Sequence, residues 1–227
     1  MRDTLPRLED LPEIFPVFPL TGAIVLPGGR LPLNIFEPRY LAMTEDALGD
    51  GRMFAMIQPD ASLPRGDSGP GLFRVGCLGR LSSFSETDDG RYLITLSGLI
   101  RFEMIEEVDM RRGYRRVRGD FSRFAGDLDE APAEGAYDRQ ALLDALRSYF
   151  QHRGFDANWE SIGAMEDAAL VTSLAMVCPF DPLEKQALLE AGSLADRAQT
   201  LRTLLRIDTH EPPSDPDASP PHRRLAS

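Results

Sequence analysis

The sequence of 227 residues has no apolar stretch long enough to cross a membrane. A transmembrane helix needs roughly 18 or more consecutive apolar residues, and no window approaches that length. Residues 1–13 mix both charge signs and lack the apolar run of a signal peptide. These absences predict a cytoplasmic protein with no membrane partner.

Cysteine is scarce as well. Cys77 and Cys178 lie far apart in the sequence, each among apolar neighbours. A free cysteine in a reducing compartment behaves as a small apolar residue, so we expect two buried thiols. Nothing in the sequence supports a disulfide between them, and a zinc site needs more ligands than the sequence offers. We therefore expect no metal.

Residues that catalyse hydrolysis are nearly missing. Of three histidines, His210 and His222 fall in a predicted tail, and His152 falls in the last turn of a predicted helix. The single lysine, Lys185, follows a helix start, and we interpret it as a solvated partner of nearby acids. The sequence contains neither a G-x-S-x-G elbow nor a phosphate-binding glycine motif. We expect no catalytic residue and no cofactor.

Basic residues are fewer than acidic ones: the sequence has 25 Lys and Arg residues and 36 Asp and Glu residues, which gives a net charge of −11. This balance argues against a general affinity for nucleic acid. One cluster runs against it and comprises Arg111, Arg112, Arg115, Arg116, Arg118 and Arg123. Two interpretations stay open: charges that protect an edge strand from pairing with other chains, or a contact for an anionic partner, either RNA or an acidic peptide.

The sequence changes character once, near residues 125–136. Short apolar runs broken by Gly, Pro and Asp predict a β-rich domain over residues 13–124. After an acidic linker at 125–136, apolar residues at helical spacing predict a bundle of about four helices over 137–207. We expect residues 1–12 to be flexible and residues 208–227 to form a disordered tail. The expected fold class is α+β.

Six segments of the β-rich part have the pattern of β-strands. They cover residues 14–20, 31–36, 53–58, 73–84, 91–108 and 114–124. Pro16 and Pro19 restrict the first of them to an edge or an irregular stretch. Asp89 and Gly90 predict a hairpin turn, and Gly98 interrupts an alternating pattern and predicts a bulge or a bend.

Helix ends are marked by their capping residues. Pro38 opens a helix at its first position, and Gly49 or Gly51 closes it. Gly154 and Pro179 each end a predicted helix of the second half. The expected helices of that half are 137–153, 159–178, 181–192 and 193–207.

The segment from Phe15 to Tyr40 reads FPVFPL and then VLPGGRLPLNIFEPRY. It resembles the opening of the Lon protease amino-terminal domain family, in which a P-x-x-P-L strand and a P-G turn lead into P-L-x-I-F-E-P-R-Y. Further matches follow in the family's order, and they are residues 57–58, 75–79, the G-x-x-R-F element at 98–102, 178–180 and 185–190. The resemblance covers about residues 12–207 and is to a stand-alone bacterial member.

This resemblance implies a PUA-like pseudo-barrel followed by a helical bundle. In the family, the domain precedes an ATPase module and a Ser–Lys peptidase module, and the sequence carries no motif of either. The resemblance thus implies a non-enzymatic module that binds unfolded or exposed protein segments, as an adaptor for a separate ATP-dependent protease. The alternative is an RNA-binding PUA-like module that uses the arginine cluster at 111–123.

One block of the resemblance is a candidate for binding. It comprises Phe36, Glu37, Pro38, Arg39 and Tyr40. In a structural interpretation, Pro38 starts the helix, Tyr40 packs and Arg39 pairs with an acid. In a functional interpretation, an aromatic residue and an arginine beside a β surface form part of a peptide-binding groove. The candidate binding residues are this block together with Arg115 and Arg116.

Overall fold

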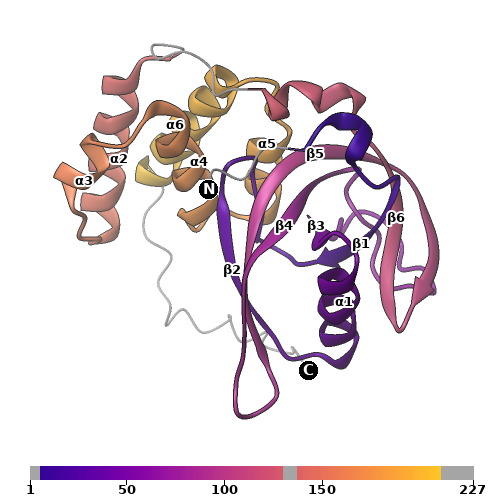
Figure 1. Cartoon of the computed structure of the whole chain (residues 1–227). Helices are drawn as coiled ribbons and strands as arrows, with labels where there is room; N and C mark the ends of the chain where they lie inside the picture. The colour runs from indigo at the N-terminus through magenta and orange to yellow at the C-terminus, as the bar shows by residue number, and fades with distance from the viewer. Residues whose placement is uncertain (1–5, 130–136, 211–227) are drawn as a thin grey trace, which may run out of the picture.

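The computed structural model describes residues 6–129 and 137–210 (Figure 1). The strands are β1 (Ile14–Pro19), β2 (Arg30–Ile35), β3 (Met53–Ile57), β4 (Val75–Glu86), β5 (Tyr92–Arg111) and β6 (Tyr114–Asp120). The helices are α1 (Pro38–Gly49), α2 (Arg139–Arg153), α3 (Trp159–Gly163), α4 (Asp167–Val177), α5 (Pro182–Glu190) and α6 (Leu194–His210), with short 3-10 helices η1 (Leu8–Asp10) and η2 (Ser122–Leu128). The predicted α+β class is confirmed.

Five of the six strands, β5, β4, β3, β1 and β6, close into a barrel, and β2 extends the sheet beyond β5. The order of all six is β2-β5-β4-β3-β1-β6, and β6 also pairs with β5. Closure is possible because β5 is long: its first half pairs with β2 and its second half with β6, while β4 runs along its other side. Among the described strands, β2 alone has a single neighbour.

The sequence suggested that the first strand is an edge or irregular strand and that the arginine cluster protects an edge strand; the structure contradicts both expectations. β6 pairs with both β1 and β5, and β1 lies between β3 and β6. Pro16 and Pro19 are tolerated inside the barrel because the neighbours of β1 are staggered. Pro16 has a partner in β6 only, and Pro19 has a partner in β3 only. A missing N–H therefore falls each time on a residue that is paired on one side.

The predicted bulge at Gly98 is confirmed. Leu78 pairs with Ile100 and Gly79 pairs with Gly98, so that Leu99 is an extra residue of β5. Gly98 lies so close to the loop before β2 that a Cβ on this residue would be 2.1 Å from the carbonyl oxygen of Leu26. The hairpin turn between β4 and β5 is also present, with Gly90 at φ +76°.

The helix expected over 159–178 is broken into α3 and α4. Arg139 of α2 explains the break, because its guanidinium donates to the carbonyl oxygens of Gly163 (3.1 Å) and Met165 (2.6 Å) and to the carboxylate of Asp167 (2.6 Å). These bonds satisfy groups that a continuous helix would have satisfied internally. Residues 137–210 therefore hold five helices, where about four were expected.

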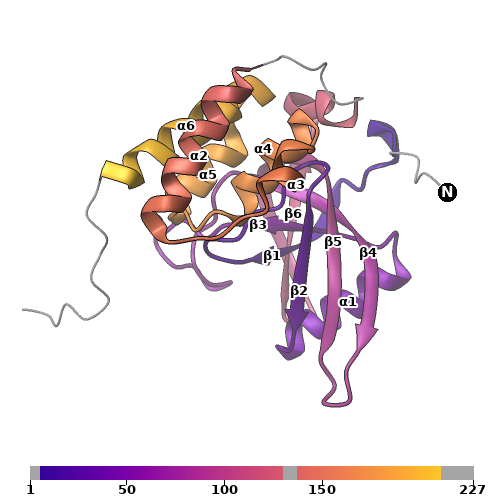
Figure 2. The same cartoon turned by 90° about the vertical axis from the view of Figure 1, so that its left-hand side faces the viewer.

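The helices of the second half cover one end of the barrel, and the β4–β5 hairpin projects away from them (Figures 1 and 2). The buried side chains of both halves form one contiguous apolar cluster. Cys77 and Cys178 are free and buried, as predicted. The predicted domain boundaries at 125–136 and 208–227 lie largely outside the described residues, although α6 extends to His210.

Candidate binding surface

The block from Phe36 to Tyr40 divides into structural and exposed residues. Pro38 occupies the first position of α1, and the ring of Tyr40 packs edge-on against Phe18 with centroids 4.2 Å apart. Glu37 accepts a hydrogen bond from Nε of Arg39 (3.0 Å). Of the five side chains in the block, Phe36 is the large apolar one left exposed, at 61%.

Arg115 and Arg116 are already engaged. Arg115 is buried and donates Nε and Nη2 to the carboxylate of Glu107 at 2.8 and 2.5 Å, and Nη1 to the carbonyl oxygen of Pro70 at 2.8 Å. Arg116 donates Nε to the carbonyl oxygen of Asp109 at 2.9 Å. Arg115 thus fastens the loop before β4 to the barrel wall, a role that the sequence pattern did not reveal.

The other arginines of the cluster are also paired with carboxylates. Arg111 and Arg112 contact Asp46, and Arg112 also contacts Glu45, both on α1. Their partners elsewhere are Glu106 and Glu13 for Arg118 and Glu103 for Arg123. These contacts offset the positive charge of the cluster, so neither edge protection nor a bare basic patch describes it.

Lys185 is not the solvated residue expected. It is 3% exposed and donates Nζ to the carbonyl oxygens of Ala175 (3.0 Å) and Met176 (2.6 Å) in the last turn of α4. An ammonium at this place satisfies carbonyls that lack a helical partner and opposes the negative end of the helix dipole. Burial lowers the pKa of Lys185.

Arg101 joins the barrel to the bundle. Its guanidinium donates Nε and Nη2 to the carboxylate of Asp127 at 2.9 and 2.7 Å. Nη1 reaches the carbonyl oxygens of Leu189 (3.1 Å) and Ala191 (2.6 Å), at the end of α5. The ring of Phe124 lies 4.4 Å from the guanidinium carbon. Arg101 is the arginine of the G-x-x-R-F element, and its structural role is to link the barrel to the bundle.

Two glutamines continue the junction. Gln58 accepts from the backbone N–H of Gly22 (2.8 Å) and donates Nε2 to the carbonyl oxygen of Pro182 (2.9 Å) and to Oε1 of Gln186 (3.1 Å). Gln186 in turn donates Nε2 to the carbonyl oxygen of Val75 at 3.1 Å. Buried and mutually satisfied amides hold α5 in a fixed position over the barrel.

We use the name seam surface for five apolar side chains on elements that adjoin this junction. They are Leu31 and Leu33 on β2, Met176 and Val177 at the end of α4, and Leu183 on α5. Val177 is 80% exposed and Leu183 is 68% exposed. The contact of Lys185 with Met176 places the first turns of α5 beside the last turn of α4.

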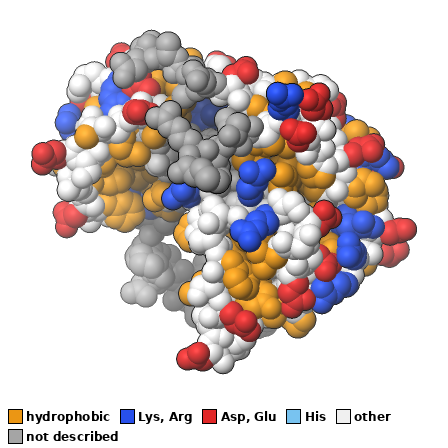
Figure 3. Space-filling view, viewed as in Figure 1, with side chains coloured by type: hydrophobic (Ala, Val, Ile, Leu, Met, Phe, Trp, Pro, Cys, Tyr) orange, Lys and Arg blue, Asp and Glu red, His pale blue; other side chains and the backbone are white. Residues whose placement is uncertain are grey.

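The end of α4 also meets the start of β2. A Cβ on Gly29 would lie 2.4 Å from Sδ of Met176, so the loop before β2 touches this helix. Figure 2 shows β2 on the near side of the barrel, below the helices. Figure 3 shows apolar side chains exposed over both halves of the molecule. All five side chains of the seam surface are apolar.

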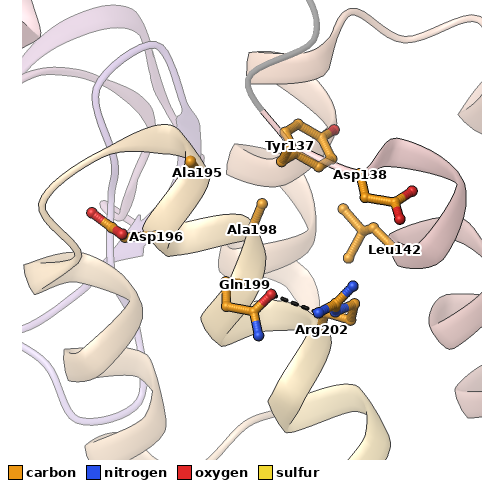
Figure 4. Close-up of a pocket in the computed structure, with 8 residues that line it drawn as sticks. All are labelled: Tyr137, Asp138, Leu142, Ala195, Asp196, Ala198, Gln199 and Arg202. Atoms are coloured by element: carbon orange, nitrogen blue, oxygen red, sulfur yellow. Dashed lines mark hydrogen bonds between the residues drawn. The ribbon is translucent and has the colours of Figure 1, made fainter.

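A pocket of about 320 Å³ lies between α2 and α6 (Figure 4). Its polar side chains have other partners. Asp138 accepts from the N–H of Ala141 at the start of α2, Asp196 accepts from the hydroxyl of Ser193, and Gln199 accepts from Arg202. The carboxylates serve helix starts. We therefore place the candidate site at the seam surface.

Residues 6–129 and 137–210 also bear on metal binding and membrane insertion. No group of three or more His, Cys, Asp or Glu side chains there could hold a metal ion. No helix within these ranges is long and apolar enough to span a membrane.

Comparison with known proteins shows what this architecture resembles. Residues 14–206 match the model of the ATP-dependent protease La (LON) substrate-binding domain. Lon protease 1 of Bdellovibrio bacteriovorus is 28% identical over 196 residues, which are 82% of this chain and 24% of that protein. Lon protease 2 of Myxococcus xanthus is 26% identical over 112 residues, 49% of this chain and 13% of that protein. The chain thus spans a quarter or less of the length of these relatives.

Solved structures agree on the fold. A Lon N-terminal domain protein from Xanthomonas campestris superposes with a TM-score of 0.59 at 20% identity, covering 84% of this chain and 97% of that one. The N-terminal domain of Mycobacterium avium complex Lon protease gives 0.56 at 17% identity, covering 85% and 98%.

Proposed function

Because the chain belongs to the family of ATP-dependent protease La (LON) substrate-binding domains, we propose that it binds unfolded or exposed segments of other proteins. It catalyses no reaction itself and passes the bound segments to a separate ATP-dependent protease. The observation that carries the proposal is the seam surface, where Val177 and Leu183 stand exposed at 80% and 68%. Unfolded chains expose apolar side chains, which this surface can cover.

The junction supports the proposal physically. Arg101, Gln58 and Gln186 fix the bundle on the barrel through buried hydrogen bonds, so the seam surface is preorganised. A preorganised apolar surface loses less conformational entropy on binding than one that must first be ordered.

The RNA-binding alternative has weaker support. Recognition of RNA phosphates requires arginines that are free to neutralise the phosphates and so release the counterions condensed on the RNA. In the cluster at 111–123, Arg112, Arg115 and Arg118 form ion pairs with carboxylates of the same chain. A binding RNA would have to displace these carboxylates.

A matched pair of variants tests the polypeptide proposal. The seam variant carries Val177→Ser and Leu183→Ser, and the control carries Ile105→Ser and Met110→Ser, whose side chains are 58% and 50% exposed on β5. We expect the seam variant to bind fluorescent, permanently unfolded casein about tenfold more weakly, since roughly 1.5 kcal/mol of apolar contact is lost. The control should bind within about twofold of the wild type.

If both variants bind casein equally weakly, the seam surface is not the binding site. Binding of a single-stranded oligoribonucleotide at low salt that is lost in Arg116→Glu, whose side chain makes one bond to the Asp109 carbonyl oxygen, with no binding of casein, would favour the RNA alternative. For the adaptor role, crosslinking in native lysate should recover an ATP-dependent protease, and purified protease should degrade casein faster when the chain is added. An unchanged degradation rate would contradict delivery.

A further inference from the structure

The free edge of β2 lies next to the seam surface. Every other described strand has a neighbour on both sides along at least part of its length, whereas β2 pairs only with β5. Figure 2 shows β2 at the front of the barrel, and no described strand pairs with the side of β2 that faces away from β5. An uncovered edge presents a row of unpaired backbone N–H and C=O groups that can pair with another extended chain.

The pairing with β5 fixes which backbone groups point outward. The N–H of Gly98 donates to the carbonyl oxygen of Gly29 at 2.9 Å. Hydrogen-bonded pairs alternate along an antiparallel ladder, so Leu31 and Leu33 bond to β5, and their neighbours turn their backbone groups to the free edge. Pro32 is one of these neighbours, and its missing N–H therefore costs the barrel nothing.

The free edge thus offers a defined set of partners. The donors are the N–H groups of Arg30 and Asn34, and the acceptors are the carbonyl oxygens of Arg30, Pro32 and Asn34. Pro32 withholds one donor from the middle of the row. The edge can accept an added strand, and it binds that strand more weakly than an edge with every N–H present.

The two faces of the edge differ chemically. On the inner face, Leu31 and Leu33 are only partly buried, and Val177 stands near the point where α4 meets the start of β2. Side chains of an added strand alternate between faces, so every second one would contact these apolar groups.

The outer face carries positive charge. Arg30, Ser97 and Arg80 lie in one row across β2, β5 and β4. Unlike Arg112, Arg115 and Arg118, neither Arg30 nor Arg80 forms an ion pair within residues 6–129 and 137–210. A carboxylate on the outer side of an added strand would find an uncompensated guanidinium here.

We infer that the chain binds its polypeptide segments by adding them as a strand to the free edge of β2. The occupant is an extended segment of another protein, with apolar residues at alternate positions and a carboxylate at an intervening position opposite Arg30. This inference rests on the proposed function and specifies how the same site recognises its substrate.

A backbone-methylated peptide pair tests strand addition directly. The parent probe is a fluorescent eight-residue peptide in which leucine alternates with threonine, with one threonine replaced by glutamate. In antiparallel addition, directly opposed residues share a face, so the N–H groups of the polar positions would face β2 and those of the leucines would face solvent. One derivative is N-methylated at the polar positions and the other at the leucines. We expect the first to bind at least about tenfold more weakly and the second within about twofold of the parent. Equal effects of both derivatives would overturn strand addition.

Two variants of β2 test it from the side of the protein. Asn34→Pro removes an outward N–H and leaves the β5 ladder intact, so the parent peptide should bind roughly fivefold more weakly. Pro32→Val adds the missing outward N–H and should tighten binding by a similar factor. Circular dichroism and the urea midpoint verify folding, and if Asn34→Pro does not fold, Pro32→Val alone decides.

The outcomes separate the inference from the proposed function. If unfolded casein binds through the seam surface and Pro32→Val leaves peptide affinity unchanged, strand addition is refuted and the proposed function stands. If neither casein nor the peptide binds the wild-type chain, both are refuted.

Discussion

Replacement of Arg101 by methionine should destabilise the whole protein strongly. Arg101 is 5% exposed, and the side chain of its partner Asp127 is 11% exposed. Methionine retains an apolar stem but leaves the Asp127 carboxylate without its ion-pair partner, together with the carbonyl oxygens of Leu189 and Ala191. Removing one partner of a buried pair costs about 3–5 kcal/mol.

The loss can be measured by urea unfolding. We expect the free energy of unfolding to fall by about 3–5 kcal/mol, which corresponds to a decrease of roughly 6–20 °C in Tm for a chain of this size. Trp159 is the only tryptophan and reports on the bundle, while far-UV circular dichroism reports on both halves. Both signals should shift together, because Arg101 bonds to both halves.

Arg123→Met provides the matched control. Arg123 also pairs with a carboxylate and also lies over the ring of Phe124, but its side chain is 54% exposed. An exposed pair contributes at most about 1 kcal/mol. Adding Asp127→Asn to Arg101→Met should restore part of the stability, because the unpaired charge is removed. If Arg101→Met costs no more than Arg123→Met, the assignment of Arg101 as the buried link is wrong.

Further predictions concern single positions. Gly98→Ala should cost at least about 1–3 kcal/mol in urea unfolding, because its Cβ would lie 2.1 Å from the Leu26 carbonyl oxygen, whereas Gly49→Ala, with open space around it, should be nearly neutral. Burial lowers the pKa of Lys185, so the unfolded chain binds this proton more tightly than the folded chain does. Relative to Lys185→Met, the free energy of unfolding of the wild type should therefore rise as pH rises toward 10.5. Parallel plots of unfolding free energy against pH for the two proteins would refute this. Burial and a carboxylate hydrogen bond raise the pKa of Tyr114 to about 12, so stability present below pH 10 should be lost as pH rises from 10 to 12. Burial also raises the pKa of Tyr137 and Tyr149 to about 12, so ultraviolet titration of Tyr114→Phe should show one late ionisation fewer than the wild type.

The candidate site could be predicted from the sequence only in part. Phe36 and its block were selected by a resemblance, and the structure assigns Tyr40 to the core and leaves Phe36 exposed. Val177 and Leu183 gave no signal, since an apolar residue in an amphipathic helix is ordinarily interpreted as core. Their exposure depends on which side of each helix meets the barrel.

What the sequence by itself determined is local. Alternation and turn residues located the six strands, the Asp-Gly hairpin and the bulge at Gly98, and the capping residues located most helix ends. These features need only contacts within a few residues, or the φ angle of one glycine, so a single segment contains their cause.

The tertiary structure decided whatever joins distant residues. Closure of the barrel made β1 and β6 interior strands, and Arg139 broke the predicted helix at 159–178 by bonding to carbonyls on another element. Arginines at 111–123 pair with carboxylates on α1 and β5, and Lys185 donates to the end of α4 and does not face solvent. The partner of a charged group depends on which segments fold side by side, and no local pattern encodes that.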